Sequence, residues 1–209
     1  MIISNKLSVS DVGIFYSIMG FITIIALYHD LGLTEALQYF LPQYRIQKEY
    51  HKIKTITIVT RVCQFVFGAL IAGIIYLSSD RLALHYFHVP NVGPTLRLFC
   101  LYFFGINFVQ TFMTFFISFQ DTFNQNLIDF IKNYTTLGFT IFFRLTNTLT
   151  LGSFSRARLL GIFVSIGAGI RIFMRKYQPI LAKGTFQRDK SLLRKQLGYA
   201  FRVFLGTNA

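Results

Sequence analysis

Long apolar segments with almost no charged residues alternate along this chain with short polar segments. Residues 12–29, 62–79 and 98–120 contain no Asp, Glu, Lys or Arg. A helix needs about 20 apolar residues to cross the hydrocarbon core of a bilayer. Three windows of this kind in one short chain predict an all-α integral membrane protein, and this decides which functions need to be considered.

The limits of the apolar segments predict one transmembrane domain over residues 1–209, a bundle of about five spans with the start of a sixth. The spans are expected at residues 12–41, 55–78, 96–119, 127–145 and 158–175, and a partial span is expected from residue 198. The first span is expected to continue as one helix through Asp30–Gly32 to Leu41, because Pro42 is typical of a helix end.

Composition supports this class of protein. The chain is 53% hydrophobic and 14% charged, whereas a typical soluble domain is about 25% charged. The net charge of +13 is concentrated beside the spans, with four basic residues in 45–54 and nine between Arg171 and Arg202. Such clusters are typical of the cytoplasmic side and of contact with anionic lipids, so we expect membrane lipids as partners and no nucleic acid.

The same charges predict an orientation. The strongly basic segment 45–54 is placed inside, and alternation of the spans then places the other connections in turn. Residues 120–126 and 176–197 are expected inside, and residues 79–95 and 146–157 outside. This describes a multi-pass protein of the cytoplasmic membrane of a bacterium or an archaeon.

Small residues at helical spacing predict close packing between the helices. One series, Gly161, Ser165 and Gly169, lies in the fifth span. Two pairs lie in the second span, Gly68 with Ala72 and Ala69 with Gly73. Small side chains allow helix backbones to approach closely in a membrane, so these faces are expected to pack against other helices.

Polar residues form a stripe on two of the spans. The third span carries Asn107, Gln110, Thr111, Thr114 and Ser118, and the second carries Thr57, Arg61, Gln64 and Gly68. Polar groups are costly against lipid, so these stripes should face the bundle or a wet cavity. They serve either interhelical hydrogen bonding or the lining of a solute site.

Arg61 is the strongest binding candidate. It lies seven residues beyond Lys54, about 10 Å deeper along a helix, where its guanidinium either attracts an anionic substrate group or extends back to the interface. Asp30 either caps a restarted helix or binds a cation. The candidate substrate-binding residues are Arg61, Gln64, Asn107, Gln110, Thr114 and Arg144.

No catalytic constellation is recognisable in the sequence. The chain has no P-loop, no HExxH and no GxSxG motif. His85 and His88 lack a third ligand nearby, so we predict no metal site. We expect no enzyme activity, no catalytic residue and no cofactor.

Two stretches resemble the polysaccharide or oligosaccharide flippases of the multidrug/oligosaccharidyl-lipid/polysaccharide exporter superfamily. They are LSVSDVGIFYSIMGF (7–21) and DLGLTEALQYFLPQY (30–44), and FQDTFNQNLIDF (119–130) is similar to the family's first half. In the first stretch Asp11 and Gly13 match the family's loop pattern. The residues that match in the second are Asp30, Gly32, Leu33, Ala36 and Leu37.

The resemblance implies a transporter that flips a lipid-linked oligosaccharide by alternating access, with cationic cavity residues engaging the lipid diphosphate. Arg61 and Arg144 are the residues available for that role. Family members have about twice as many spans, in two lobes around a cavity. The chain is therefore expected to be one partial lobe that lacks the family's first span, and to need a second lobe or a partner copy for transport.

Two alternatives stay open at the level of the sequence. One is a related exporter of drugs or of a lipid precursor. The other is a membrane scaffold that transports nothing and packs through its small-residue faces.

Overall fold

All regular structure in the described part of the chain is helical. The computed structural model describes residues 9–28, 30–89, 92–148, 150–187 and 189–207. Its helices are α1 (Val9–Tyr28), α2 (Leu33–Ile46), α3 (Tyr50–Leu77), α4 (Ser79–His85), α5 (Gly93–Ser118), α6 (Thr122–Leu145), α7 (Leu151–Lys176), α8 (Gln178–Ala182) and α9 (Lys190–Thr207). The predicted all-α fold is confirmed.

Three of these helices are long and apolar enough to cross a membrane. They are α3, α5 and α7, whose mean hydropathy over the most apolar window is 2.0, 1.6 and 1.7. In α1 the apolar stretch is shorter, Val12–Ala26, and α6 carries the ion pair of Lys132 with Asp129. The count of five spans stays a prediction for these two regions.

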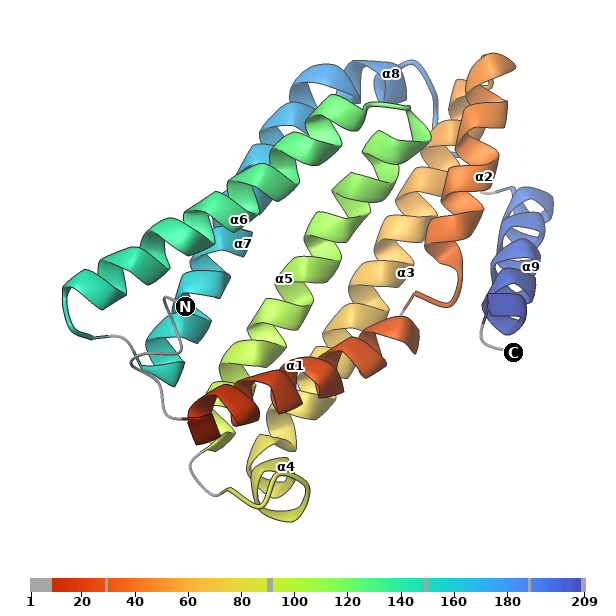
Figure 1. Cartoon of the computed structure of the whole chain (residues 1–209). Coiled ribbons are helices and arrows are strands. Elements are labelled where there is room, and N and C mark those ends of the chain that lie inside the picture. Colours follow the sequence, from red (N-terminus) through yellow and green to blue (C-terminus); the bar gives the residue numbers. More distant parts are fainter. Residues whose placement is uncertain (1–8, 29, 90–91, 149, 188, 208–209) are drawn as a thin grey trace.

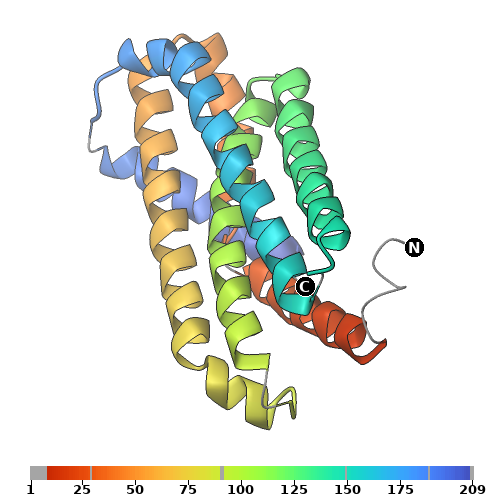
Figure 2. The same cartoon turned by 90° about the vertical axis from the view of Figure 1, so that its left-hand side faces the viewer.

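The helix α5 forms the centre of the bundle. It packs against α3 on one side and α7 on the other, α6 packs on α7, and α2 packs on both α3 and α5 (Figure 1). Seen from the side, the axes of α3, α5 and α7 are roughly parallel, and the chain runs through α3 in the direction opposite to α5 and α7 (Figure 2). The helix α1 crosses α5 obliquely near one end of the bundle.

Phenylalanine fills much of the core along α5. Phe115 and Phe116 are completely buried in one apolar cluster near the end of α5, and Phe99 and Phe103 are buried in a second cluster near its beginning, together with Phe15 of α1. Aromatic side chains bury large apolar areas, so these two clusters hold the central helix against its neighbours.

The predicted inside and outside connections lie at opposite ends of the bundle. The α2–α3 connection, the α5–α6 turn and α8 lie at one end, and α4 with the α6–α7 connection lies at the other (Figure 1). We call the first the basic end, because it carries Arg45, Lys48, Lys52, Lys176 and Lys183. The assignment of the basic end to the cytoplasm remains a prediction.

The expected single helix over residues 12–41 is wrong, because the chain breaks between α1 and α2. Leu31 and Gly32 have φ of 48° and 75°, a left-handed conformation that ends a helix and favours glycine. A β-carbon on Gly32 would also collide with the backbone carbonyl of Ala200 in α9. Residue 29 lies outside the described residues.

Pro42 does not end the helix as expected. It lies inside α2, which continues to Ile46. Proline removes one backbone hydrogen bond from a helix interior, but Leu41 and Tyr44 on either side of it are buried in the core. Their packing holds the last turn in helical form.

The small residues of α7 pack as predicted. Ser165 is fully buried, and a β-carbon on Gly161 would collide with the Thr136 hydroxyl of α6 and lie 2.8 Å from the backbone oxygen of Lys132. A β-carbon on Gly169 would lie 2.8 Å from the Phe112 ring of α5. These glycines therefore set the distances from α7 to α6 and α5.

The small residues of α3 behave differently. A β-carbon on Gly68 would meet only the Asn107 amide, at 3.8 Å, and one on Gly73 would meet nothing within 4 Å. Ala69 is exposed on the surface of the bundle. Gly68 is buried and Ala72 packs against the apolar cluster that contains Phe99, so this pair packs as predicted. The second pair, Ala69 and Gly73, borders an open seam.

A hydrogen-bonded clamp closes the basic end. Asp121, in the α5–α6 turn, accepts hydrogen bonds from Lys176 Nζ at 2.7 Å, from Asn124 Nδ2 at 2.6 Å and from the Tyr177 hydroxyl. Arg45 of α2 donates to the backbone oxygen of Phe119 at 3.2 Å. Burial opposes ionisation of Asp121, but these hydrogen bonds outweigh it and lower its pKa to about 2.

We expect Gly161→Ala to destabilise the fold by about 1–3 kcal/mol, because the new methyl group forces α6 and α7 apart. Gly167→Ala is the matched control, since its β-carbon would point into open space, and it should be neutral or stabilising by up to about 1 kcal/mol. Thermal unfolding of the purified protein in detergent measures both. Equal effects of the two variants would contradict close packing at Gly161.

We expect Asp121→Asn to lower the free energy of unfolding at pH 7 by about 1–3 kcal/mol. The pKa of Asp121 is depressed in the folded state to about 2, so its stabilisation is complete above about pH 5 and is lost as the pH falls toward 2. The difference between wild type and variant should therefore shrink with acid in melting curves. Asp80→Asn, which removes a more exposed ion pair with Arg97, should change stability by no more than about 1 kcal/mol.

Candidate functional site

A hydrogen-bonded network joins α1–α2, α3 and α5 at the middle of the bundle. The Gln64 amide of α3 donates to Asp30 Oδ1 at 2.5 Å and to Thr34 Oγ1 at 3.1 Å. Its oxygen accepts a hydrogen bond from Thr111 Oγ1 of α5 at 3.0 Å. Gln64 lies halfway along α3 and is 6% exposed, so this network crosses the most apolar depth of the predicted membrane.

Asp30 caps the start of α2, which is one of the two roles expected for it from the sequence. Its Oδ2 accepts a hydrogen bond from the backbone nitrogen of Thr34 at 2.7 Å, in the first turn of α2. Its other oxygen holds Gln64. The carboxylate therefore stabilises the break between α1 and α2 and fixes the orientation of the Gln64 amide.

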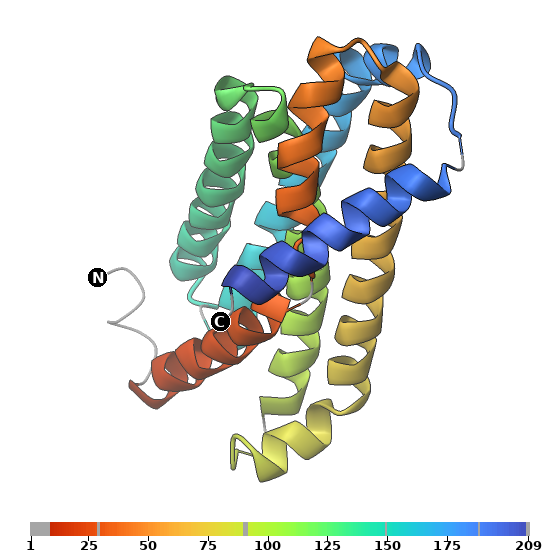
Figure 3. The same ribbon diagram turned by 90° about the vertical axis from the view of Figure 1, so that its right-hand side faces the viewer.

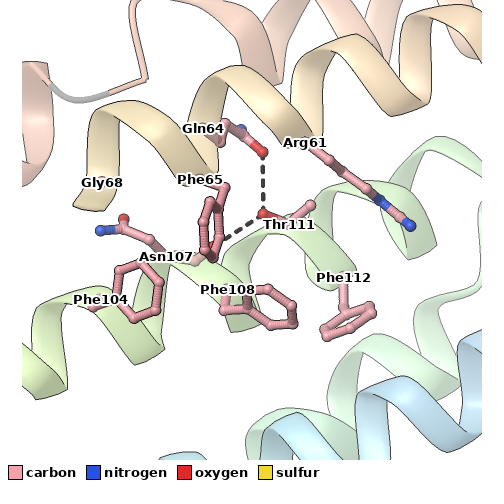
Figure 4. Close-up of a pocket in the computed structure, with 9 residues that line it drawn as sticks. All are labelled: Arg61, Gln64, Phe65, Gly68, Phe104, Asn107, Phe108, Thr111 and Phe112. Carbon is pink, nitrogen blue, oxygen red and sulfur yellow. Dashed lines mark hydrogen bonds between the residues drawn. The ribbon is translucent and has the colours of Figure 1, made fainter. Parts of the chain in front are cut away.

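A pocket lies beside this network in the seam between α3 and α5 (Figure 4). Its cavity volume is about 70 Å³. One part of its lining is polar and the other is aromatic. The residues are Arg61, Gln64, Phe65 and Gly68 of α3 and Phe104, Asn107, Phe108, Thr111 and Phe112 of α5.

Arg61 lies at one end of this pocket. Its guanidinium extends over the rings of Phe115 in α5 and Phe173 in α7, with its carbon 5.4 and 4.0 Å from the ring centroids. Nη2 is buried and has no hydrogen-bond partner among the described residues. Aromatic faces stabilise a cation only in part, so this nitrogen keeps an unsatisfied donor.

Asn107 is the second polar residue with a free donor. Its side chain is 9% exposed, and Nδ2 is buried without a partner in the described part of the chain. Figure 4 shows Asn107 and Arg61 toward opposite ends of the pocket, with Gln64 and Thr111 between them. The pocket therefore offers a cation, two amides and a hydroxyl beside an aromatic wall.

The structure brings together three of the six predicted site residues. Arg61, Gln64 and Asn107 line the pocket. Thr114 is buried outside it, and Arg144 lies in the last turn of α6 at the end opposite to the basic end.

Gln110 is exposed rather than turned into the bundle, so its place in the predicted inward stripe is wrong. At about 100° per residue it lies about 60° around α5 from Asn107, on the side away from Phe104 and Phe108.

Sequence reasoning missed the aromatic side of the pocket. Phe104, Phe108 and Phe112 recur every four residues on α5, next to the polar stripe, and this spacing places them on one helix face. The signal was present but is weak in a chain with 25 phenylalanines.

Comparison with known proteins gives one informative relative. It is an uncharacterized membrane protein of the archaeon Methanocaldococcus jannaschii, 22% identical over 215 aligned positions that cover 97% of this chain and 42% of the relative. This chain therefore spans less than half of the length of that protein. No protein-family profile matches the chain, and no solved structure matches it.

The apolar helices, the all-α fold and the membrane-protein relative agree on the class of protein. The chain is a helical membrane protein with a polar, partly aromatic pocket in the seam between α3 and α5, two helices that are long and apolar enough to cross a membrane.

We expect Gln64→Met to destabilise the fold by about 1–3 kcal/mol, because Asp30, Thr34 and Thr111 lose their shared partner inside the membrane. Gln110→Met is the matched control on the exposed side of α5 and should change stability by less than about 0.5 kcal/mol. Thermal unfolding in detergent distinguishes them. If Gln64→Met is as stable as wild type, the network does not hold α3 to its neighbours.

Proposed function

We propose that this chain is part of a membrane transporter that moves a lipid-linked oligosaccharide across the cytoplasmic membrane. The observation that carries the proposal is Arg61, a cation inside a membrane-spanning helix with a buried nitrogen that has no partner among the described residues. Charged residues inside a membrane are costly and mark substrate pathways. A guanidinium matches the geometry of phosphate oxygens.

The surroundings of Arg61 support a substrate that combines a phosphate with sugars. Asn107 provides an amide nitrogen with no partner among the described residues, and such a group donates hydrogen bonds to hydroxyl groups of a ligand. The aromatic wall offers flat apolar surfaces beside it. The flippase resemblance of residues 7–21 and 30–44 points to the same substrate class.

The helix break at Asp30–Gly32 adds a second feature expected of transporters. Discontinuous helices occur in transporters near the midplane, where they border the binding site. Here the capping residue of the break, Asp30, holds Gln64, and Gln64 lines the pocket. A change in the pocket would therefore act directly on the joint between α1 and α2.

We expect Arg61→Gln, made in the polypeptide as its gene encodes it, to reduce transport of a lipid-linked oligosaccharide by about 10- to 100-fold. This corresponds to losing a charge-assisted hydrogen bond worth about 1.5–3 kcal/mol. Reconstituted vesicles measure the reaction as the fraction of labelled lipid-linked glycan that becomes accessible to an outside lectin.

Arg158→Gln is the matched control for this experiment. Arg158 also lies in a membrane-spanning helix and also stacks on aromatic rings, those of Phe15 and Phe154, but it does not line the pocket. Transport should survive Arg158→Gln. Unchanged transport with Arg61→Gln would disprove the role of Arg61. If the wild type transports nothing and Arg61→Gln impairs only assembly, the result favours a membrane scaffold.

A further inference from the structure

A second pocket lies at the basic end, away from the site described above. It is formed where three segments meet, which are the last turn of α2, the α5–α6 turn and the junction of α7 with α8. Figure 1 shows these segments at the same end of the bundle. The cavity volume is about 210 Å³, many times the space that one water molecule needs. We call it the basic-end pocket.

The ends of two apolar helices fix the depth of this pocket. Both α5 and α7 have 26 residues and run toward the basic end. Such a helix is about 39 Å long, close to the thickness of a bilayer with its head-group regions, about 40–45 Å. Phe119, which follows α5, and Lys176, which ends α7, both line the pocket. The pocket therefore lies at the level of lipid head groups.

Two cations line the pocket from different helices. Arg45 of α2 donates from Nη1 to the backbone oxygen of Phe119 at 3.2 Å, and its guanidinium carbon lies 4.9 Å from the centroid of the Phe119 ring. Its other donors have no protein partner in the described part of the chain. Lys176 Nζ lies 2.7 Å from Asp121, and its side chain is 55% exposed. Both cations therefore keep donors for a ligand.

Asp121 is the carboxylate among the described residues that line the pocket, and it does not cancel the two cations. Its side chain is 10% exposed and accepts hydrogen bonds from Asn124, Lys176 and the Tyr177 hydroxyl. These donors already satisfy the carboxylate. Two cations and one carboxylate leave the lining with a net charge of +1, which favours an anionic ligand.

Apolar surface borders the same cations. Phe119 and Ile180 line the pocket, and Ile46, the residue after Arg45, is 83% exposed. An exposed isoleucine beside cations is typical of a surface that meets the boundary between head groups and acyl chains. A lipid contacts both the cations and the apolar side chains, whereas a free phosphate contacts only the cations. The lining therefore favours a lipid over a soluble anion.

The pocket also separates two helices that do not pack on each other. Among the described residues α2 packs on α3, α5 and α9, and α7 packs on α1, α5, α6 and α8. Arg45 and Lys176 bring one cation from each of these helices to the same pocket. Guanidinium and ammonium groups both bind phosphate, so one phosphate between them would link α2 to α7.

We infer that the basic-end pocket binds the head group of one anionic phospholipid, with its phosphate between Arg45 and Lys176 and its glycerol region against Phe119 and Ile180. The basic clusters of the sequence attract anionic lipids in general, and this pocket selects one position among them. The bound lipid holds the end of α2 to the α7–α8 junction. The inference is independent of the proposed function, because it involves neither Arg61 nor the pocket between α3 and α5.

Binding of matched lipids to the purified full chain tests the inference. Native mass spectrometry compares phosphatidylglycerol with phosphatidylcholine of the same acyl chains, and we expect the first phosphatidylglycerol to bind about tenfold or more tightly. It should also raise the melting temperature in detergent by about 2–4 °C. Inorganic phosphate, which has the charge without the chains, should leave the melting temperature unchanged.

Three variants locate the site. Arg45→Gln and Lys176→Gln should each weaken the first phosphatidylglycerol by about tenfold. Gln120→Glu adds a negative charge to the lining, and the Gln120 side chain makes no hydrogen bond with the described residues. It should weaken binding similarly while the lipid-free protein melts as the wild type does. Arg175→Gln is the matched control, because Arg175 is exposed beside Lys176 and does not line the pocket. Its affinity should equal that of the wild type.

Four results would overturn the inference. Equal binding of the two lipids would show that the charge is not recognised. Wild-type affinity in both Arg45→Gln and Gln120→Glu would exclude the pocket, and an equal loss in Arg175→Gln would show only diffuse attraction to the basic surface. A rise in melting temperature with inorganic phosphate alone would identify a site for a soluble anion instead of a lipid.

Discussion

The rest of this bundle depends on one constraint: a polar side chain inside an apolar helix of a membrane protein needs hydrogen-bond partners on neighbouring segments. Gln64 of α3 has such partners. Its amide nitrogen binds Asp30 and Thr34, and its amide oxygen accepts from Thr111. Three separate segments of the chain are thereby held at one depth. This one amide links the break between α1 and α2, the packing of α3 on α5 and the wall of the pocket.

The sequence predicted the helices well because hydropathy is a local property. Charge-free windows located α3 and α5, and the apolar run before the basic cluster at Arg171 located α7, without any knowledge of their partners. The break at Gly32 was missed because it depends on a left-handed backbone and on contact with Ala200, which is distant in the sequence. Pro42 was read as a stop because the burial of its neighbours in the core is a tertiary effect.

The candidate site was predicted in part for similar reasons. Helical spacing identified the polar faces of α3 and α5. It does not determine which polar residues of the two helices form hydrogen bonds with each other. Thr111 pairs with Gln64, whereas Gln110, the preceding residue, turns outward. The aromatic side was missed because phenylalanine occurs on nearly every face of this chain, and only the packing of α3 on α5 separates the rings that line the pocket from those that fill the core.

The position of α9 has a consequence for how the protein is made. This helix crosses the outside of α2 and α3 (Figure 3), stacks Tyr199 on Tyr39, and reaches Thr60 through Gln196, a pair separated by 136 residues. During synthesis α3 enters the membrane long before α9 exists, and contacts this distant in sequence form late. Until α9 docks, the Thr60 hydroxyl lacks its partner and the α1–α2 joint is uncovered. The docking of α9 therefore supplies the partner of Thr60 and covers the break between α1 and α2.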